Sequence, residues 1–141
     1  MPQKITLGYK TLLEEANKQI ETIPAADAVK TFPTGGADNV VIVDLRDPRE
    51  IEREGRIPGA FSCPRGMLEF WIDPESPYAK PIFQEDKKFI FHCASGWRSA
   101  LAAKVAQEMG LKPVAHIGDG FTAWREAGGA VEKVEPKKPK A

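Results

Sequence analysis

The sequence contains few of the residues from which metal sites and disulfide frameworks are built. Among its 141 residues there are two cysteines, Cys63 and Cys93, and two histidines, His92 and His116. The cysteines are not in a C-x-x-C spacing, so we expect no tetrahedral zinc site. Such a small number of cysteines favours free thiols in a reducing compartment. We therefore expect no metal ion, and the sequence indicates no other cofactor.

Net charge and long apolar runs are also absent. The 20 basic residues balance the 20 acidic ones, so no long-range field is expected that would attract nucleic acid or an anionic membrane. No stretch of about 18 apolar residues occurs, and the amino terminus lacks the pattern of a secretory signal. These absences predict a cytoplasmic protein that has neither nucleic acid nor a membrane as a partner.

Hydrophobic periodicity predicts one α/β domain. Residues 40–43 and 89–92 are apolar runs bounded by turn residues, as is typical of strands covered on both faces, and residues 114–117 form a third strand. Helical spacing or helix-start signals predict five helices between and around the strands, at residues 9–21, 24–30, 48–54, 99–109 and 121–127. This alternation indicates a three-layer fold with a central parallel sheet and helices on both faces.

The chain divides into three predicted parts. Residues 1–23 form an amino-terminal helical extension, residues 24–131 the domain, and residues 132–141 a tail. The tail has too little apolar surface to order itself, so we expect it to be disordered. Within the domain, residues 65–86 are rich in proline and fit no clear period. They predict a long connecting excursion, with one helical turn near residues 67–71, that is long enough to form a lid.

Cys93 is the strongest candidate for chemistry, because it follows a buried strand and directly precedes a helix. Ligands of open α/β sheets bind beyond the carboxyl ends of strands, where a helix amino terminus offers unpaired N–H groups. The small residues Ala94, Ser95 and Gly96 let the loop curl so that its amides converge on the sulfur. These features favour a reactive thiolate. Arg98 would either brace this loop or bind an anionic substrate.

The loop and several other motifs resemble the rhodanese family of sulfurtransferases. The resemblance covers about residues 24–129 and depends on four motifs in order, which are Asp44-Leu45-Arg46, Glu50 with Gly55-Arg56-Ile57-Pro58-Gly59-Ala60, Cys93-Ala94-Ser95-Gly96-Trp97-Arg98-Ser99, and Gly118-Asp119-Gly120-Phe121 with Trp124.

The resemblance implies that Cys93 accepts a sulfur atom from a donor such as thiosulfate and holds it as a persulfide. An acceptor thiol, cyanide or a sulfur-relay protein would then remove it. The substrate-binding residues would be those of the loop, namely Ala94, Ser95, Gly96, Trp97, Arg98 and Ser99.

Two alternatives stay open. Arg56 stands where the family usually has histidine, and Asp119 interrupts a usual glycine pair. With the long excursion, these departures allow a sulfur-carrier or protein-interaction module of low activity. A phosphatase or arsenate reductase of the same fold is less favoured. Their loop has five residues between cysteine and arginine, whereas four separate Cys93 from Arg98, and a tighter cradle suits one sulfur better than a dianion.

Structural roles are expected for most other polar and aromatic residues. Strand alternation should point His92 away from Cys93. Asp44 and Arg46 are expected to connect loops by hydrogen bonds, and Cys63 to be a small apolar residue instead of a resolving thiol.

The aromatic residues near the predicted site are interpreted in the same way. Trp124, Phe70 and Trp71 are expected in the core. Trp97 would either line the pocket or pack against the excursion.

Overall fold

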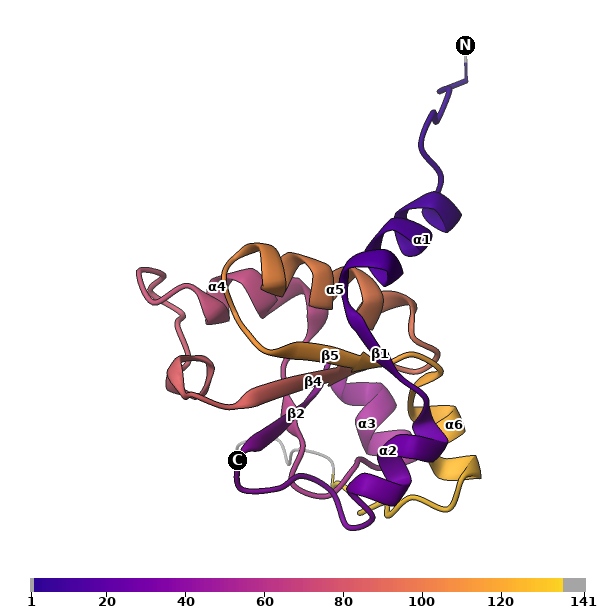
Figure 1. Ribbon diagram of the computed structural model, residues 1–141, viewed down its shortest axis with the longest axis vertical. Helices are drawn as coiled ribbons and strands as arrows, with labels where there is room; N and C mark the ends of the chain where they lie inside the picture. Colours follow the sequence, from indigo (N-terminus) through magenta and orange to yellow (C-terminus); the bar gives the residue numbers. More distant parts are fainter. Residues whose placement is uncertain (1, 136–141) are drawn as a thin grey trace, which may run out of the picture.

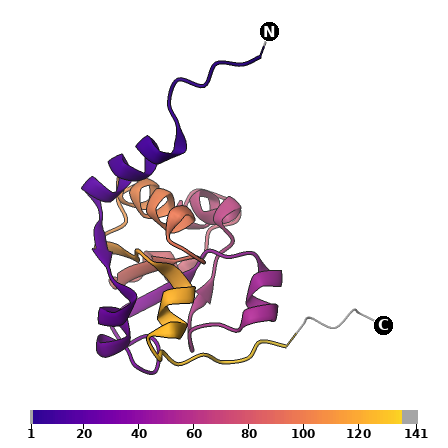
Figure 2. The same ribbon diagram turned by 90° about the vertical axis from the view of Figure 1, so that its right-hand side faces the viewer.

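The computed structural model describes residues 2–135 and contains a five-stranded parallel sheet between two layers of helices (Figures 1 and 2). The strands are β1 (Glu21–Ile23), β2 (Val40–Asp44), β3 (Phe61–Ser62), β4 (Lys88–His92) and β5 (Val114–Ile117), and their order in the sheet is β1-β5-β4-β2-β3. Every pairing between neighbours is parallel. The predicted α/β three-layer fold is confirmed.

Helices cover both faces of the sheet. One layer consists of α1 (Tyr9–Gln19), α4 (Leu68–Ile72) and α5 (Trp97–Glu108), and the other of α2 (Ala25–Thr31), α3 (Pro48–Glu54) and α6 (Gly120–Glu126). Two hydrophobic clusters fill the spaces between these layers and the sheet. Alternation along β4 divides its side chains between the clusters, with Phe89 and Phe91 in one and Ile90 in the other. This burial on both faces explains the uninterrupted apolar runs of the central strands.

The sequence analysis did not predict two short strands. The edge strands β1 and β3 have three and two residues, which is too short for an alternation of polar and apolar residues to be recognised. Strand β1 pairs with β5, with Glu21 opposite Ala115, so the sheet begins before residue 24. The predicted amino-terminal extension therefore contributes an edge strand to the sheet.

The excursion of residues 65–86 is built into the helical layer. It contains the 3-10 helices η1 (Arg65–Met67) and η2 (Pro81–Gln84) and, as predicted, one helical turn, α4. Its side chains Leu68, Ile72 and Phe83 are buried in the core, and Phe83 stacks on Phe89 at a centroid distance of 5.6 Å. These anchors fix the excursion to the sheet, so it is not a freely moving lid.

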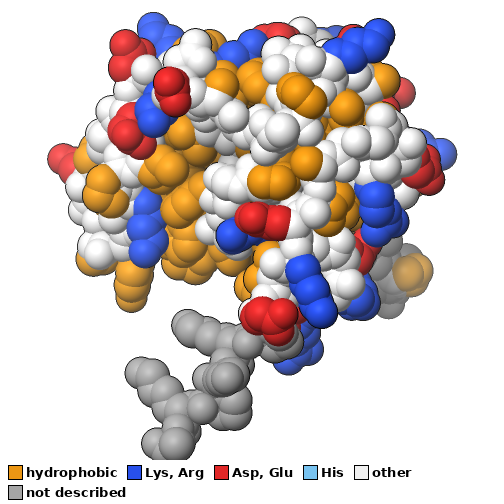
Figure 3. Space-filling view, turned by 90° about the horizontal axis from the view of Figure 1, so that it is seen from below, with side chains coloured by type: hydrophobic (Ala, Val, Ile, Leu, Met, Phe, Trp, Pro, Cys, Tyr) orange, Lys and Arg blue, Asp and Glu red, His pale blue; other side chains and the backbone are white. Residues whose placement is uncertain are grey.

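The surface has mixed charge. On the face seen in Figure 3, basic and acidic side chains of the described residues are interspersed. Within residues 2–135, no helix has both the length and the apolar composition that a membrane span requires.

Candidate active site

Cys93 lies at the carboxyl end of β4, where the chain turns into α5. Its side chain is buried, and the Gly96 amide lies 3.2 Å from Cys93 Sγ and donates a hydrogen bond to it. Gly96 is the amino-terminal cap of α5 and has a φ of 100°. A Cβ atom there would lie 1.9 Å from the Gly118 carbonyl oxygen. Only glycine therefore allows the loop to aim this amide at the sulfur.

The loop is held in place by the turn that begins α6. The Phe121 amide donates to the Cys93 carbonyl at 2.8 Å, and the Thr122 amide donates to the Ala94 carbonyl at 3.3 Å. A Cβ atom on Gly120 would lie 2.3 Å from the same Ala94 oxygen. The glycine motif at residues 118–121 thus packs against the Cys93 loop and holds it in place.

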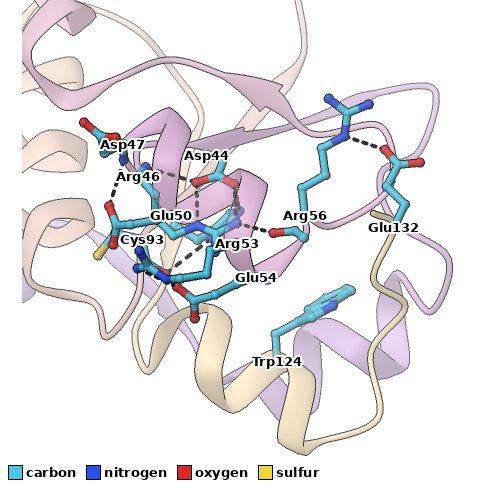
Figure 4. A network of polar contacts seen from close by, with 12 residues as sticks. Asp44, Arg46, Asp47, Glu50, Arg53, Glu54, Arg56, Cys93, Trp124 and Glu132 are labelled. Atoms are coloured by element: carbon cyan, nitrogen blue, oxygen red, sulfur yellow. Dashed lines mark hydrogen bonds and ion pairs between the residues drawn. The ribbon is translucent and has the colours of Figure 1, made fainter. Parts of the chain in front are cut away.

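Arg98 is bound to α3 and not to the carbonyls of its own loop. Its Nη1 and Nη2 atoms donate to the two carboxylate oxygens of Glu50 at 2.8 and 3.0 Å. Glu50 also accepts a 2.8 Å bond from the Asp47 amide as part of a capping box that starts α3 (Figure 4). Hydrogen bonding to Arg98 lowers the pKa of Glu50 from 4.5 to about 2. Sequence reasoning predicted the start of this helix but not this partner for Arg98.

The guanidinium of Arg98 nevertheless lies close to the Cys93 sulfur. The pKa of Arg98 is raised, first by hydrogen bonds to Glu50 and in smaller part by the neighbouring Cys93 thiol. Its side chain keeps 39% of its exposure, so an anion that approaches Cys93 can reach one edge of it.

The remaining loop residues differ in their exposure to solvent. Ser99 is fully buried, with its Oγ 3.7 Å from Cys93 Sγ, whereas Ala94 is partly exposed and Ser95 is exposed. Trp97 is 56% exposed, and its ring lies 4.9 Å from that of Tyr9 in α1. Helix α1 therefore provides an aromatic neighbour for Trp97 that neither of the two expected positions included.

A buried ionic cluster lies below the loop. Arg46 donates through Nε and Nη2 to Asp44 at 3.0 and 2.8 Å, and through Nη2 to the Gly55 carbonyl at 2.8 Å. The guanidinium also sits 4.0 Å from the centroid of the Phe121 ring. Asp44 and Arg46 connect loops, as predicted.

His92 belongs to the same cluster. It is fully buried on the side of the sheet opposite Cys93 and stacks on Phe121, as strand alternation predicted. Burial lowers the pKa of His92, so it is neutral at neutral pH. Its Nε2 atom lies 3.7 Å from Asp44 Oδ2.

Arg56, which departs from the expected histidine, faces away from the thiol. Its Nε atom donates to Glu132 Oε1 at 2.5 Å, and the two backbones form an antiparallel bridge. In Figure 4 this pair and Cys93 lie on opposite sides of the polar network. Glu132, the first residue of the predicted disordered tail, is thus held to the domain. Residues 136–141 of that tail lie outside the described residues.

The other predicted core residues divide into two groups. Trp124 is fully buried and donates through Nε1 to the Ala130 carbonyl at 2.9 Å, and Trp71 is partly buried beside Phe61. Phe70 is 55% exposed, so its predicted core position is wrong. The short helix α4 turns it outward while Leu68 and Ile72 point inward.

Cys63 is buried, and burial raises the pKa of its thiol to about 12. It is therefore an unreactive apolar side chain at neutral pH. Within residues 2–135, no group of three or more histidine, cysteine, aspartate or glutamate side chains is arranged to hold a metal ion.

Three polar residues near the thiol escaped the sequence analysis. His116 on β5 lies with Nδ1 2.9 Å from Ser99 Oγ, and its Nε2 lies 3.0 Å from Asn17 Oδ1 and 3.2 Å from Thr22 Oγ1. Burial lowers the pKa of His116 to about 4. The only available signal was the alternation in β5, which places His116 on the opposite face from its neighbours Ala115 and Ile117.

Comparisons with known proteins show the family of the chain. Residues 27–127 match the model of the rhodanese-like domain. The chain is 29% identical to the mitochondrial thiosulfate sulfurtransferase RDL2 of Saccharomyces cerevisiae, over 94% of this chain and 88% of that protein. It is 34% identical to the thiosulfate sulfurtransferase GlpE of Pseudoalteromonas translucida, over 70% of this chain and 83% of that protein.

A solved structure from Rhodopseudomonas palustris is more similar still. That protein is described as one of unknown function and a possible tyrosine phosphatase, and it is 71% identical to this chain. The similarity covers 94% of this chain and 99% of the other, with a TM-score of 0.90. The matched domain and the names of the curated relatives support a sulfurtransferase family. The chain belongs to the rhodanese-like family.

Proposed function

We propose that this protein transfers sulfane sulfur from thiosulfate, or a similar anionic donor, to a thiol or cyanide through a persulfide on Cys93. The observation that carries the proposal is the position of the Cys93 sulfur. It lies 3.2 Å from the Gly96 amide, just before α5 begins. A helix amino terminus and a converging amide stabilise negative charge on sulfur. The same groups would stabilise the outer sulfur of a persulfide.

The reaction needs two displacements at sulfur. The Cys93 thiolate attacks the outer sulfur of thiosulfate, a new S–S bond forms, and sulfite leaves with the electrons of the broken bond. The acceptor then attacks the outer sulfur of the persulfide, and Cys93 leaves as a thiolate. Both leaving groups are stable anions, so neither displacement needs a general acid or an added redox partner.

Access to the sulfur suits a small anionic donor. Cys93 itself is buried, but Ala94 and Ser95 at the outside of the loop and the edge of Arg98 are open to solvent. The loop therefore offers a narrow approach with a cation beside it. Sulfur-relay proteins that present a flexible cysteine could use the same approach.

A phosphatase activity, which the description of the Rhodopseudomonas palustris protein raises, is the second candidate. Arginine binds a phosphoryl group through both arms of its planar fork. In this protein both terminal nitrogens of Arg98 are engaged by Glu50. A loop with only four residues between Cys93 and Arg98 favours a single sulfur over a phosphoryl group, because a dianion needs a wider cradle of N–H donors.

Mass spectrometry of the intact protein after incubation with thiosulfate tests the proposal. We expect one added sulfur atom, which dithiothreitol removes. The Cys93→Ser variant should gain none, whereas Cys63→Ser, the matched control, should gain it as the wild type does. If the wild type stays unmodified with several donors but releases phosphate from an aryl phosphate, the phosphatase is the correct assignment. Location in the cytoplasm stays a prediction from the sequence.

A further inference from the structure

A chain of hydrogen-bonding groups leads from Cys93 to the surface behind the site. Cys93 Sγ lies 3.7 Å from Ser99 Oγ, which lies 2.9 Å from His116 Nδ1. The other ring nitrogen of His116, Nε2, lies 3.0 Å from Asn17 Oδ1 and 3.2 Å from Thr22 Oγ1. These residues come from α5, β5, α1 and β1, so the tertiary structure assembles the chain.

The middle of this chain is sealed from solvent and its far end is not. Ser99 and His116 are 0% and 1% exposed, whereas Asn17 is exposed. Asn17 and Thr22 line a surface hollow of about 400 Å³. His116 Nε2 contacts both of these residues, so Asn17 and Thr22 connect it to the hollow.

The hydrogen-bonding directions at the far end follow from the asparagine. Asn17 Nδ2 donates to the Leu13 carbonyl at 3.0 Å, so its Oδ1 faces His116 and can only accept. When Nε2 carries the proton of the ring, it donates to Asn17, and Nδ1 accepts from the Ser99 hydroxyl. In the structure the Thr22 hydroxyl donates to Asn17 Oδ1 at 3.3 Å. When Nε2 carries no proton, this hydroxyl can turn and donate to Nε2 instead.

His116 can adopt either arrangement because its ring is neutral at neutral pH. Burial lowers its pKa to about 4. The groups that face it from α1, β1 and α5 are Asn17, Thr22 and Ser99, all uncharged. A neutral imidazole carries its one proton on either nitrogen, and the hydrogen bond made by the other nitrogen decides which.

We propose that Ser99 and His116 form a proton relay that carries the Cys93 proton to solvent at the Asn17 and Thr22 hollow. In the thiol state, Sγ–H donates to Ser99, Ser99 donates to Nδ1, and Nε2–H donates to Asn17. On ionisation, the thiol proton passes to Ser99 Oγ, the Ser99 proton passes to Nδ1, the Nε2 proton passes to Thr22 Oγ1, and the Thr22 hydroxyl proton leaves to water. One proton leaves, and no group is oxidised or reduced.

The relay makes the ionisation of Cys93 and the tautomer of His116 a single event. In the thiolate state Ser99 is free to donate its hydrogen bond to the sulfur, because Nδ1–H now donates to Ser99. The proton also has an exit while a donor anion occupies the front of the site. His116 is thus a positioning residue. Its catalytic use rests on the proposed function of Cys93, but the tautomer change itself requires no sulfur transfer.

The tautomer of His116 can be observed directly, because the sequence contains only two histidines, His92 and His116. The full-length protein carrying ¹⁵N-histidine is studied by two-bond ¹H–¹⁵N correlation spectra across a pH series. The rate of Cys93 alkylation by iodoacetamide reports its ionisation in the same samples. We expect the His116 proton to move from Nε2 to Nδ1 in step with that ionisation. His92, on the opposite face of the sheet, should not change and serves as the internal control.

Two conservative variants separate the relay from a through-space effect. In Cys93→Ser the serine side chain does not ionise within the pH series, so the tautomer change of His116 should be lost. In Ser99→Ala the thiol is kept and the connection is broken, so His116 should no longer follow Cys93. Unchanged backbone amide spectra would verify that both variants fold. The relay is overturned if His116 keeps one tautomer while Cys93 ionises, or if it still follows Cys93 in Ser99→Ala. Either result is independent of persulfide formation, which the mass measurement decides separately.

Discussion

Glu50 holds both terminal nitrogens of Arg98, at 2.8 and 3.0 Å from its two carboxylate oxygens. The pair joins α3, which follows β2, to α5, which follows β4. Because Glu50 also closes the capping box of α3, the position of Arg98 beside Cys93 depends on a helix start about 50 residues earlier in the chain.

Arg98→Lys should slow thiosulfate turnover while leaving the protein folded. Lysine keeps the charge but loses the planar fork that fits the Glu50 carboxylate. Loss of one charge-assisted hydrogen bond, about 1.4 kcal/mol, corresponds to a decrease of about tenfold if the loop geometry contributes fully to the rate. Steady-state kinetics measure the effect, and Arg53→Lys, at an exposed pair with Glu54, is the matched control. Equal rates for both variants would show that the Arg98 fork is not needed.

The stability of the protein should fall at low pH in part through Glu50. Its pKa is lowered from 4.5 to about 2, so the folded state binds the proton less readily than the unfolded state. The stabilisation is therefore present above about pH 4.5 and is lost as the pH falls towards about 2. Solvent screening limits it to about 1 kcal/mol.

Urea unfolding of wild type and Glu50→Gln measures this contribution. Glutamine retains the capping hydrogen bond but not the charge. The difference in unfolding free energy between the two proteins should be about 1 kcal/mol near pH 6 and should shrink near pH 2.5. A difference that stays constant over this range would contradict the assignment to Glu50.

Gly96→Ala should remove both stability and activity. The residue has a φ of 100°, and a Cβ atom would meet the Gly118 carbonyl oxygen at 1.9 Å. Backbone strain alone costs about 1–3 kcal/mol, and the loop would have to move away from the sulfur. Gly110→Ala provides the control, because Gly110 has a φ of 103° with no atom within 4 Å of a Cβ position. It should lose some stability by thermal unfolding but keep its activity.

Removing one partner of the buried pair of Asp44 and Arg46 should be strongly destabilising. Both side chains are buried, and Arg46 would keep an unpaired charge in Asp44→Ala. The expected cost is about 3–5 kcal/mol in urea unfolding, and the double variant Asp44→Ala with Arg46→Met should cost less than the single one. A double variant at least as unstable as Asp44→Ala would show that the contact with Gly55 dominates.

Arg56→His should change thiosulfate kinetics by less than about twofold. Arg56 pairs with Glu132 on the side of the network away from Cys93 (Figure 4). Its pair is partly exposed, so little loss of stability is expected. Kinetics of Arg56→His and of Glu132→Gln should agree. A large change in both would place the Arg56 pair in substrate recognition.

The fold and the nucleophile could be read from the sequence because both depend on local signals. The run of apolar residues at 89–92, Cys93 and the small residues after it predicted a strand, a loop and a helix in that order. The helix-start signal at residue 48 and the glycines at 118 and 120 were local as well. The strands β1 and β3 were not predictable in this way, since each is defined by its pairing with a neighbour and not by its own pattern.

The sequence by itself determined the order of elements, the burial of the central strands and the loop that presents Cys93. Only the tertiary structure decided the partners of the site residues. Arg98 meets Glu50, Trp97 meets Tyr9, and His116 connects Ser99 to Asn17. The physical reason is that periodicity, capping and turns act within a few residues. The directional polar contacts around the thiol, by contrast, join segments that become neighbours only when the parallel sheet brings their strand ends together.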